Sequence, residues 1–333
     1  MNRLAGGRAP CVAGIVIYRP QIEALRRLVA SLADEVAIVA IYANSPIGAD
    51  EQQRLAAAAG AAELVVLRPA LNRGLGAAYN ALRALAQATE NEFLLLLDQD
   101  SALRPGTVET LVATHRRLAA RGERAAVVGP QPIDLQGKAM RLSTRTGVPP
   151  SGTEPLRASF VISSGSLIRL DALVAIGDFR ADYFIDAIDI EWCLRAGAAG
   201  YSIWVDPAVP MPHSLGKGII RLPFGLLLTD QPSRRLYTYV RNQLAMLRLR
   251  HVPVRYKAKF LLSLPVRLAV HLIHHRFSSD CITALANGLV DGVLGRMGPP
   301  DRALIPWRDP GLRMDAPRSS PAADAAAPGR RLP

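Results

Sequence analysis

The feature that most constrains the fold is a regular alternation of short apolar runs and longer amphipathic segments through about the first 130 residues. The apolar runs are CVAGIVIY (11–18), EVAIVAIY (35–42), AELVVLR (62–68), FLLLLD (93–98) and AAVVGP (125–130). Strands that alternate with helices of this length predict βαβ units and an α/β fold, in which a mostly parallel sheet is flanked by helices. The runs are apolar throughout, as expected for strands that are covered on both faces.

The pattern changes after the fifth run. Residues 131–160 are turn-rich and basic, which predicts a loop or a small excursion from the sheet. Beyond them, ASFVISSGSLIR (158–169) predicts a strand, FIDAIDIEWCLRAGAAG (184–200) a helix and YSIWVDP (201–207) a final strand. We therefore expect the α/β domain to extend from residue 11 to residue 216.

The composition changes again from residue 217. Segments 234–250, 255–276 and 279–295 predict basic amphipathic helices, although Pro265 predicts that the second is not one continuous helix. The last residues are rich in Pro, Ala and Arg, which is typical of disorder. The predicted parts are a flexible N-terminus (1–10), the α/β domain (11–216), a C-terminal helical region (217–308) and a disordered tail (309–333).

Charge and cysteine usage narrow the class of protein. The net charge of +12 favours an anionic partner, such as nucleotide phosphate, lipid head groups or nucleic acid. Cys11, Cys193 and Cys281 show no pairing pattern, which excludes a disulfide scaffold and a zinc site. The sequence shows neither a secretory signal nor a run of about 18 uncharged apolar residues. We expect a cytoplasmic protein, either soluble or peripheral to a membrane.

Two aspartates follow the fourth apolar run in FLLLLDQDS (93–101). Asp98 and Asp100 fall beyond the carboxyl end of a strand, where ligands bind in open parallel sheets. Two carboxylates at this spacing can hold one hard cation such as Mg²⁺, which also takes substrate phosphates. Alternatively, Asp98 or Ser101 starts a turn or caps the next helix, and the pair alone favours this second interpretation.

Two other segments carry candidate groups. In NRGLGAAYN (72–80), Gly74 opens a helix after a strand, so N–H groups at the helix N-terminus can face an anion or form an ordinary turn. In FIDAIDIEWCLR, Asp189 lies among large apolar residues, where a raised pKa suits a general base. Asp186 and Glu191 beside it can instead complement the dipole of a helix N-terminus.

Three polar residues follow the last predicted strand. His213 lies on a proline-rich loop, where a lone histidine is more often structural, but imidazole is also a frequent metal ligand. Arg241 and Asn242, in LYTYVRNQ, can contact phosphate or line a solvated helix face. Spacing alone does not decide between these roles.

Together, and in this order, the segments resemble one family. They are IVIYRP, NSP, NRGLGAAYN, LLLLDQDS, SSGSLIR, IGDFRADYFIDAIDIEWCLRAGAAGY, HSLG, YVRN and DGVLGRMG. Their sequence and spacing are similar to glycosyltransferase family 2, and most of all to its bacterial rhamnosyltransferases that use dTDP-L-rhamnose. The resemblance extends from residue 11 to about residue 298. It implies a GT-A fold with a Rossmann-like sheet, and an inverting sugar transfer that depends on Mg²⁺ or Mn²⁺.

The resemblance also implies roles in the chemistry. Asp100 matches the metal ligand of a D-x-D motif, and Asp98 matches the residue that contacts the nucleotide sugar or supports the metal. His213 matches a histidine that completes the metal site in relatives. Asp189 matches the catalytic base that deprotonates the acceptor hydroxyl, and Glu191 beside it would orient the acceptor or the base.

Other residues match the part of the family that binds the donor. The residues expected there are Asn44, Ser45, Asn72, Gly74, Asn80 and Arg241, with a supporting role for Asp186. One position departs from the family pattern, because Ala43 stands where relatives usually carry an Asp that meets the nucleotide base. Both dTDP and UDP therefore stay open as the nucleotide.

The expected partners are a nucleotide-diphosphate sugar and a saccharide or lipid-linked saccharide, in the synthesis of an envelope polysaccharide such as O-antigen. The basic segment 255–276 either binds a membrane surface or only caps the α/β domain, and no nucleic-acid partner is expected. One alternative is a transferase that uses UDP-galactofuranose, UDP-galactose or UDP-glucose. Another is a non-catalytic basic protein that binds membranes. A nucleotidyltransferase is disfavoured because YRPQIEALRR lacks a glycine for a phosphate loop.

Overall fold

The computed structural model describes residues 8–134, 137, 139–140, 153–212, 218–221 and 227–300. Within these residues, an eight-stranded sheet runs in the order β3-β2-β1-β4-β7-β5-β8-β6. The strands are β1 (Ala9–Ile17), β2 (Val36–Ala43), β3 (Glu63–Leu67), β4 (Phe93–Asp98), β5 (Ala125–Ile133), β6 (Leu156–Ala158), β7 (Ser166–Arg169) and β8 (Ser202–Pro212). β7 is antiparallel to β4 and β5, and β6 is antiparallel to β8, while the other pairs are parallel. The predicted mostly parallel sheet is confirmed.

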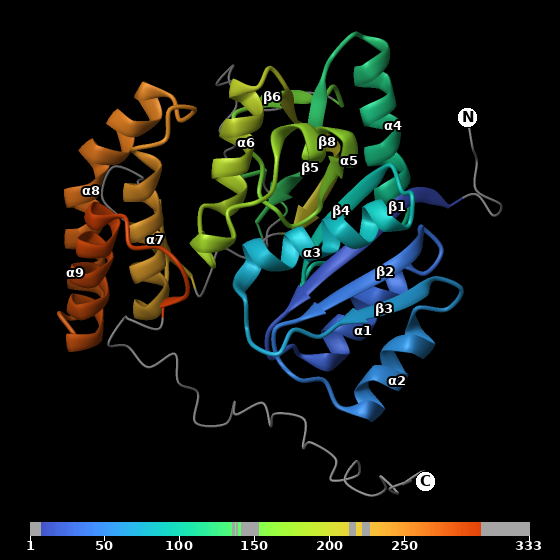
Figure 1. Ribbon diagram of the computed structural model, residues 1–333, viewed down its shortest axis with the longest axis horizontal. Helices are drawn as coiled ribbons and strands as arrows, with labels where there is room; N and C mark the ends of the chain where they lie inside the picture. Colours follow the sequence, from blue (N-terminus) through green and yellow to red (C-terminus); the bar gives the residue numbers. More distant parts are fainter. Residues whose placement is uncertain are drawn as a thin grey trace, which may run out of the picture.

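Helices cover both faces of this sheet (Figure 1). They are α1 (Ile22–Leu32), α2 (Ala49–Ala58), α3 (Gly74–Ala88), α4 (Thr107–Ala120), α5 (Leu170–Ile176) and α6 (Ile188–Ala198). On β4, Phe93, Leu95 and Leu97 pack in one buried cluster with α1, α2 and α4. Leu94 and Leu96 pack in another with α3, α5 and α6. The uninterrupted apolar run of β4 is thus explained, because successive side chains point to opposite faces and both faces are buried.

Two predicted elements begin and end differently in the structure. The segment 158–169 is not one strand, because β6 ends at Ala158 and β7 begins only at Ser166. The helix predicted from residue 184 begins at Ile188, because Phe184, Asp186 and Ala187 have positive φ values of 63°, 69° and 62°. Non-glycine residues rarely adopt this conformation, and it usually needs outside support.

The C-terminal region is built from α7 (Ser233–Met246), α8 (Val254–His274) and α9 (Ser279–Leu294), next to a two-stranded sheet of β9 (Gly218–Arg221) and β10 (Leu227–Asp230). α7 lies nearest the α/β domain, with α8 and α9 outside it (Figure 1). None of the helices within the described ranges combines the length and apolar character that a bilayer crossing requires. The terminal segments 1–7 and 301–333 lie outside the described residues.

The prediction that Pro265 interrupts α8 was wrong, since the helix continues through it. Proline in a helix interior costs about 3 kcal/mol. Against this, Phe260 is buried and Leu264 and Leu268 are partly buried in a third apolar cluster with α7 and α9. Full burial of a side chain of this size contributes about 1.5–3 kcal/mol, and each partly buried leucine contributes a fraction of that amount. This packing offsets the cost of the proline.

Candidate active site

A cavity of about 770 Å³ lies at the carboxyl ends of β1, β2 and β4. Its walls also include residues 184–190, which lead into α6, and one face of α7. This volume is typical of sites for small molecules. The predicted site residues that line it are Asn44, Asn72, Gly74, Asp98, Asp100, Asp186 and Asp189. Segments distant in the sequence thus bring their acidic groups to one cavity.

Asp98 and Asp100 occupy a turn whose shape Ser101 determines. The Asp98 N–H donates to Ser101 Oγ (3.0 Å), and the Ser101 N–H donates to the carbonyl oxygen of Asp98 (3.1 Å). Ser101 Oγ also lies 2.7 Å from Ser164 Oγ. The capped turn and the ligand site are therefore not alternatives here. Ser101 closes the turn, and both aspartates line the cavity.

The folded chain destabilises the charged form of the Asp98 carboxyl group. Burial, and then the charges of Asp100 and Asp189, raise the pKa of Asp98 to about 6, while Arg235 acts in the opposite direction. A cation in the cavity would relieve this repulsion.

Asp189 is the second residue of α6. Its Oδ1 accepts the N–H of Ile190 (2.8 Å), and its Oδ2 accepts the N–H of Ser163 (3.2 Å). Burial nevertheless raises the pKa of Asp189, and these backbone N–H groups offset only part of the effect. A carboxylate with a raised pKa that borders a cavity is suited to accept a proton.

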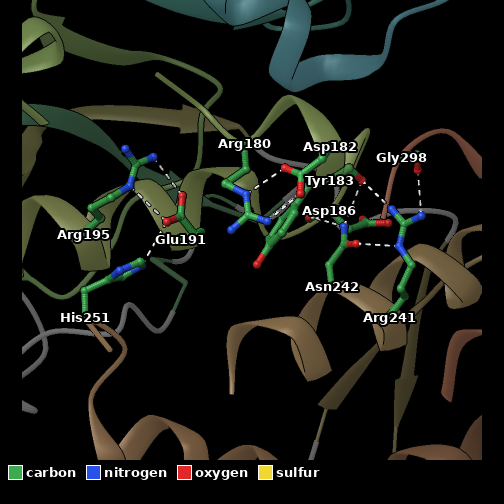
Figure 2. Close-up of polar contacts among 10 residues, drawn as sticks. All are labelled: Arg180, Asp182, Tyr183, Asp186, Glu191, Arg195, Arg241, Asn242, His251 and Gly298. Atoms are coloured by element: carbon green, nitrogen blue, oxygen red, sulfur yellow. Dashed lines mark hydrogen bonds and ion pairs between the residues drawn. The ribbon is translucent and has the colours of Figure 1, made fainter. Parts of the chain in front are cut away.

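The strained segment before α6 is held by two buried residues of α7 (Figure 2). Asn242 Nδ2 donates to the carbonyl oxygens of Tyr183 (3.0 Å), Ile185 (2.7 Å) and Asp186 (2.9 Å). The guanidinium of Arg241 donates to the carbonyl oxygens of Tyr183 (3.0 Å) and Gly298 (2.7 Å), and its Nε to Asn242 Oδ1 (3.0 Å). Arg241, predicted to bind the donor, does not line the cavity and instead supports the strained segment before α6.

Sequence reasoning missed a row of polar residues on α7. Arg235, Tyr239 and Gln243 line the cavity from successive turns of the helix. Arg235 Nη2 donates to Asp186 Oδ1 (2.5 Å), and the charge of Asp186 raises the pKa of the guanidinium. Thr238 Oγ1 donates to Asp186 Oδ2 (2.6 Å). The i, i+4, i+8 spacing of the three polar side chains was a usable signal.

Glu191 does not line the cavity. It is buried, and its carboxylate forms two contacts of 3.0 Å with Arg195. Its Oε1 also lies 2.9 Å from Nε2 of His251, just before α8 (Figure 2). The geometry gives Glu191 a structural role between α6 and the helical region.

Asn80 and Ser45 also lie outside the cavity lining. Asn80 exchanges two hydrogen bonds with the backbone of Phe179, donating to its oxygen (3.0 Å) and accepting from its N–H (2.9 Å). Ser45 Oγ accepts the N–H of Arg19 (2.7 Å), whose φ is 50°. These two side chains fix the loops around the cavity.

The N-terminus of α3 does not present free donors to an anion at its first positions. Asn44 Oδ1 accepts the N–H of Arg73 (3.0 Å), and Asn72 Oδ1 accepts the N–H of Gly74 (2.9 Å). The next N–H, of Leu75, donates to the carbonyl oxygen of Phe184 (2.6 Å). Gly74 is required there, because a Cβ would lie 2.4 Å from that oxygen. Gly74 therefore allows α3 to pack closely against the strained segment before α6.

The metal site is described only in part. His213, the third predicted ligand, lies outside the described residues. Within the described residues, no three His, Cys, Asp or Glu side chains gather closely enough to hold a metal ion. Asp98 and Asp100 nevertheless fit a divalent cation, since hard oxygen ligands suit Mg²⁺ and Mn²⁺. Burial, and then neighbouring negative charge, raise the pKa of Asp98, and a cation would relieve both effects.

The fold of the described residues is similar to that of several solved glycosyltransferases. Residues 1–349 of S. aureus TarS, in complex with UDP-GlcNAc, match with a TM-score of 0.57 and 16% identity, over 85% of this chain and 80% of that chain. The mannosyltransferase PcManGT of Pyrobaculum calidifontis, in complex with GDP-Man and Mn²⁺, matches with a TM-score of 0.50 and 12% identity, over 86% and 75%. GalNAc-T7, with UDP, GalNAc and Mn²⁺, has a TM-score of 0.50 and 16% identity over 69% of this chain, which spans 47% of that chain.

Sequence comparison agrees with the structural class. The dTDP-rhamnosyl transferase RfbF of Shigella flexneri is 27% identical over 249 residues, which are 72% of this chain and 80% of that protein. No protein-family model matches the chain. The predicted resemblance to rhamnosyltransferases is confirmed, and so is the prediction that the chain is an enzyme of the glycosyltransferase class.

Proposed function

We propose that the chain transfers L-rhamnose from dTDP-L-rhamnose to a saccharide acceptor, with inversion at the anomeric carbon. The observation that carries this proposal is that Asp98, Asp100 and Asp189 line one cavity at the carboxyl ends of the parallel strands. The similarity to the Shigella rhamnosyl transferase supports the choice of sugar.

In the proposed reaction, Asp189 takes the proton of the acceptor hydroxyl, and the acceptor oxygen bonds to C1 of the sugar. The bond from C1 to the diphosphate breaks, and its electron pair stays on the leaving diphosphate. This single displacement needs one base on the acceptor side, and the raised pKa of Asp189 suits it to hold that proton.

The leaving diphosphate needs positive charge. Asp98, Asp100 and His213 would hold Mg²⁺ or Mn²⁺, and the ion would supply charge neutralisation at the phosphates. The Mn²⁺ in the complexes of GalNAc-T7 and PcManGT supports this assignment. Arg235 would contribute a second positive group, because it lines the same cavity and already faces Asp186.

Two nucleotides, dTDP and UDP, are candidates for the donor. Ala43 is buried at the end of β2, where the family pattern has an Asp, and Asn44 next to it lines the cavity. Similar structures hold UDP or GDP donors. A transferase for a UDP-sugar is therefore the second candidate.

A titration of the purified protein with dTDP, UDP and GDP tests the proposal, with and without Mg²⁺ or Mn²⁺. We expect cation-dependent binding of dTDP that is lost in Asp100→Ala and kept in the matched surface variant Asp34→Ala. A preference for UDP would keep the class of enzyme and reject rhamnose. Absence of nucleotide binding in the wild type would reject the proposed function.

The acceptor is proposed to be a saccharide or lipid-linked saccharide of an envelope polysaccharide such as O-antigen. The protein would act in the cytoplasm, at the inner face of the cytoplasmic membrane. The similarity to RfbF and the basic C-terminal helices support this part of the proposal.

A further inference from the structure

The outer side of α8 carries large apolar side chains that nothing in the described structure covers. Val254 is 79% exposed, Leu262 81%, Val266 53% and Ile273 65%. At 3.6 residues per turn, these four positions fall within about a third of the helix circumference. Phe277, three residues beyond the end of the helix, is also exposed. Monomeric soluble proteins rarely leave a continuous row of this kind in water.

The exposed apolar row of α8 is separate from the apolar core of the helical region. Another side of α8, with Phe260, Leu264, Leu268 and Leu272, packs with α7 and α9. Figure 1 shows α8 in the outer layer of the molecule, away from the sheet. The exposed residues are thus an additional apolar face, beyond what the fold needs.

The charge of this segment indicates the kind of partner. Residues 254–277 include five Arg or Lys and three His, and they include no Asp or Glu. Arg255 and Lys259 are exposed on the same side of α8 as the apolar row, and Arg276 is exposed just beyond the end of the helix. A protein partner for an apolar face does not require such one-sided charge, whereas an anionic lipid surface attracts it.

We propose that the outer face of α8 binds the surface of an anionic membrane. Val254, Leu262, Val266, Ile273 and Phe277 would insert among the lipid head groups and upper acyl chains, while Arg255, Lys259 and Arg276 contact lipid phosphates. The helix would lie in the plane of the surface, with its other side still packed on α7.

This surface is connected to the walls of the cavity. Arg267 of α8 donates to the hydroxyl of Tyr239 (2.7 Å), and Tyr256 donates to Gln243 Oε1 (3.1 Å). Both acceptors are cavity residues. The surface would bring a lipid-linked acceptor to the cavity, and this use rests on the proposed function. Lipid binding itself does not depend on the proposed function.

Co-sedimentation with vesicles tests the proposal, using phosphatidylcholine alone or mixed with phosphatidylglycerol, without nucleotide. We expect the wild type to bind the anionic vesicles and not the neutral ones. Leu262→Glu/Ile273→Glu should lose binding, and Arg255→Gln/Lys259→Gln should bind about 25-fold more weakly, which is about fivefold for each basic residue. The control Val174→Glu changes an exposed apolar residue of α5 and should bind like the wild type.

Three results would each overturn the proposal. The first is wild-type protein that does not sediment with anionic vesicles, and the second is an α8 variant that sediments as well as Val174→Glu. The third is a dimer in light scattering that Leu262→Glu/Ile273→Glu dissociates, because the face would then bind a second copy of the chain. Nucleotide titration of the same samples separates this result from the proposed function, since either binding can fail without the other.

Discussion

Replacing Asp98 by Asn should stabilise the fold at neutral pH while it removes donor binding. In the wild type, burial and the charges of Asp100 and Asp189 raise the pKa of Asp98 from 3.8 to about 6. A difference of this size between the unfolded and folded chain corresponds to about 3 kcal/mol of unfolding free energy. Asn has nearly the same shape and no charge, so the variant avoids this cost.

The effect of Asp98 on the free energy of unfolding changes between about pH 4 and pH 6. The folded chain keeps the proton of Asp98 up to about pH 6, whereas the unfolded chain loses it near pH 3.8. The unfolded state therefore binds fewer protons in this interval, and the stability of the wild type falls as the pH rises through it. Above this interval, the charged Asp98 lowers the free energy of unfolding by the full amount, and below it Asp98 is protonated and has no such effect.

Urea denaturation of the wild type, Asp98→Asn and the exposed control Asp34→Asn measures this difference. We expect Asp98→Asn to gain about 3 kcal/mol at about pH 8 and almost nothing at about pH 3.5, with no such pattern in the control. Mg²⁺ or Mn²⁺ should stabilise the wild type and not Asp98→Asn. An Asn variant that gains nothing at the higher pH, or as much at both, would refute the electrostatic argument.

Three further changes give distinct outcomes. Asp189→Asn should slow sugar transfer by roughly 10²- to 10⁴-fold in a radiolabel assay, with nucleotide affinity unchanged in calorimetry. Asn242→Ala should lower the free energy of unfolding by about 2–3 kcal/mol in urea denaturation, because three backbone carbonyls lose a donor, and transfer should fall with it. Gly76→Ala should cost about 1–3 kcal/mol in the same measurement, because its Cβ would lie 2.4 Å from the oxygen of Arg180, whereas the control Gly197→Ala has no neighbour closer than 3.9 Å.

The sheet was predictable because its signal is local. Each strand from β1 to β5 is a short apolar run bounded by turn residues, and the helices between them show apolar residues at helical spacing. The segment FIDA was mispredicted as helix for a physical reason. Its positive φ values are maintained by Asn242 and Arg241, more than 50 residues away, and no local pattern reports such support.

The candidate site could be predicted where chemistry and position coincide. Asp98 ends β4, Asp100 lies in the turn that follows it, and Asp189 lies in the first turn of α6, all at the edge of the sheet where ligands bind. Glu191 and Arg241 belong to the same motifs but face other parts of the fold. The direction in which a polar side chain points depends on the residues that it contacts in the fold. The spacing of a motif does not identify those residues.

The central element of the site is α7, since each of its sides contacts a different part of the structure. One side lines the cavity with Arg235 and Tyr239, and Asn242 holds the segment that leads to the proposed base. The remaining side packs against α9, where a Cβ on Gly288 would lie 2.8 Å from the carbonyl oxygen of Tyr237. A helix constrained on all sides cannot shift without moving the cavity wall. A displacement of α8 on a membrane would therefore be transmitted to the cavity through α7.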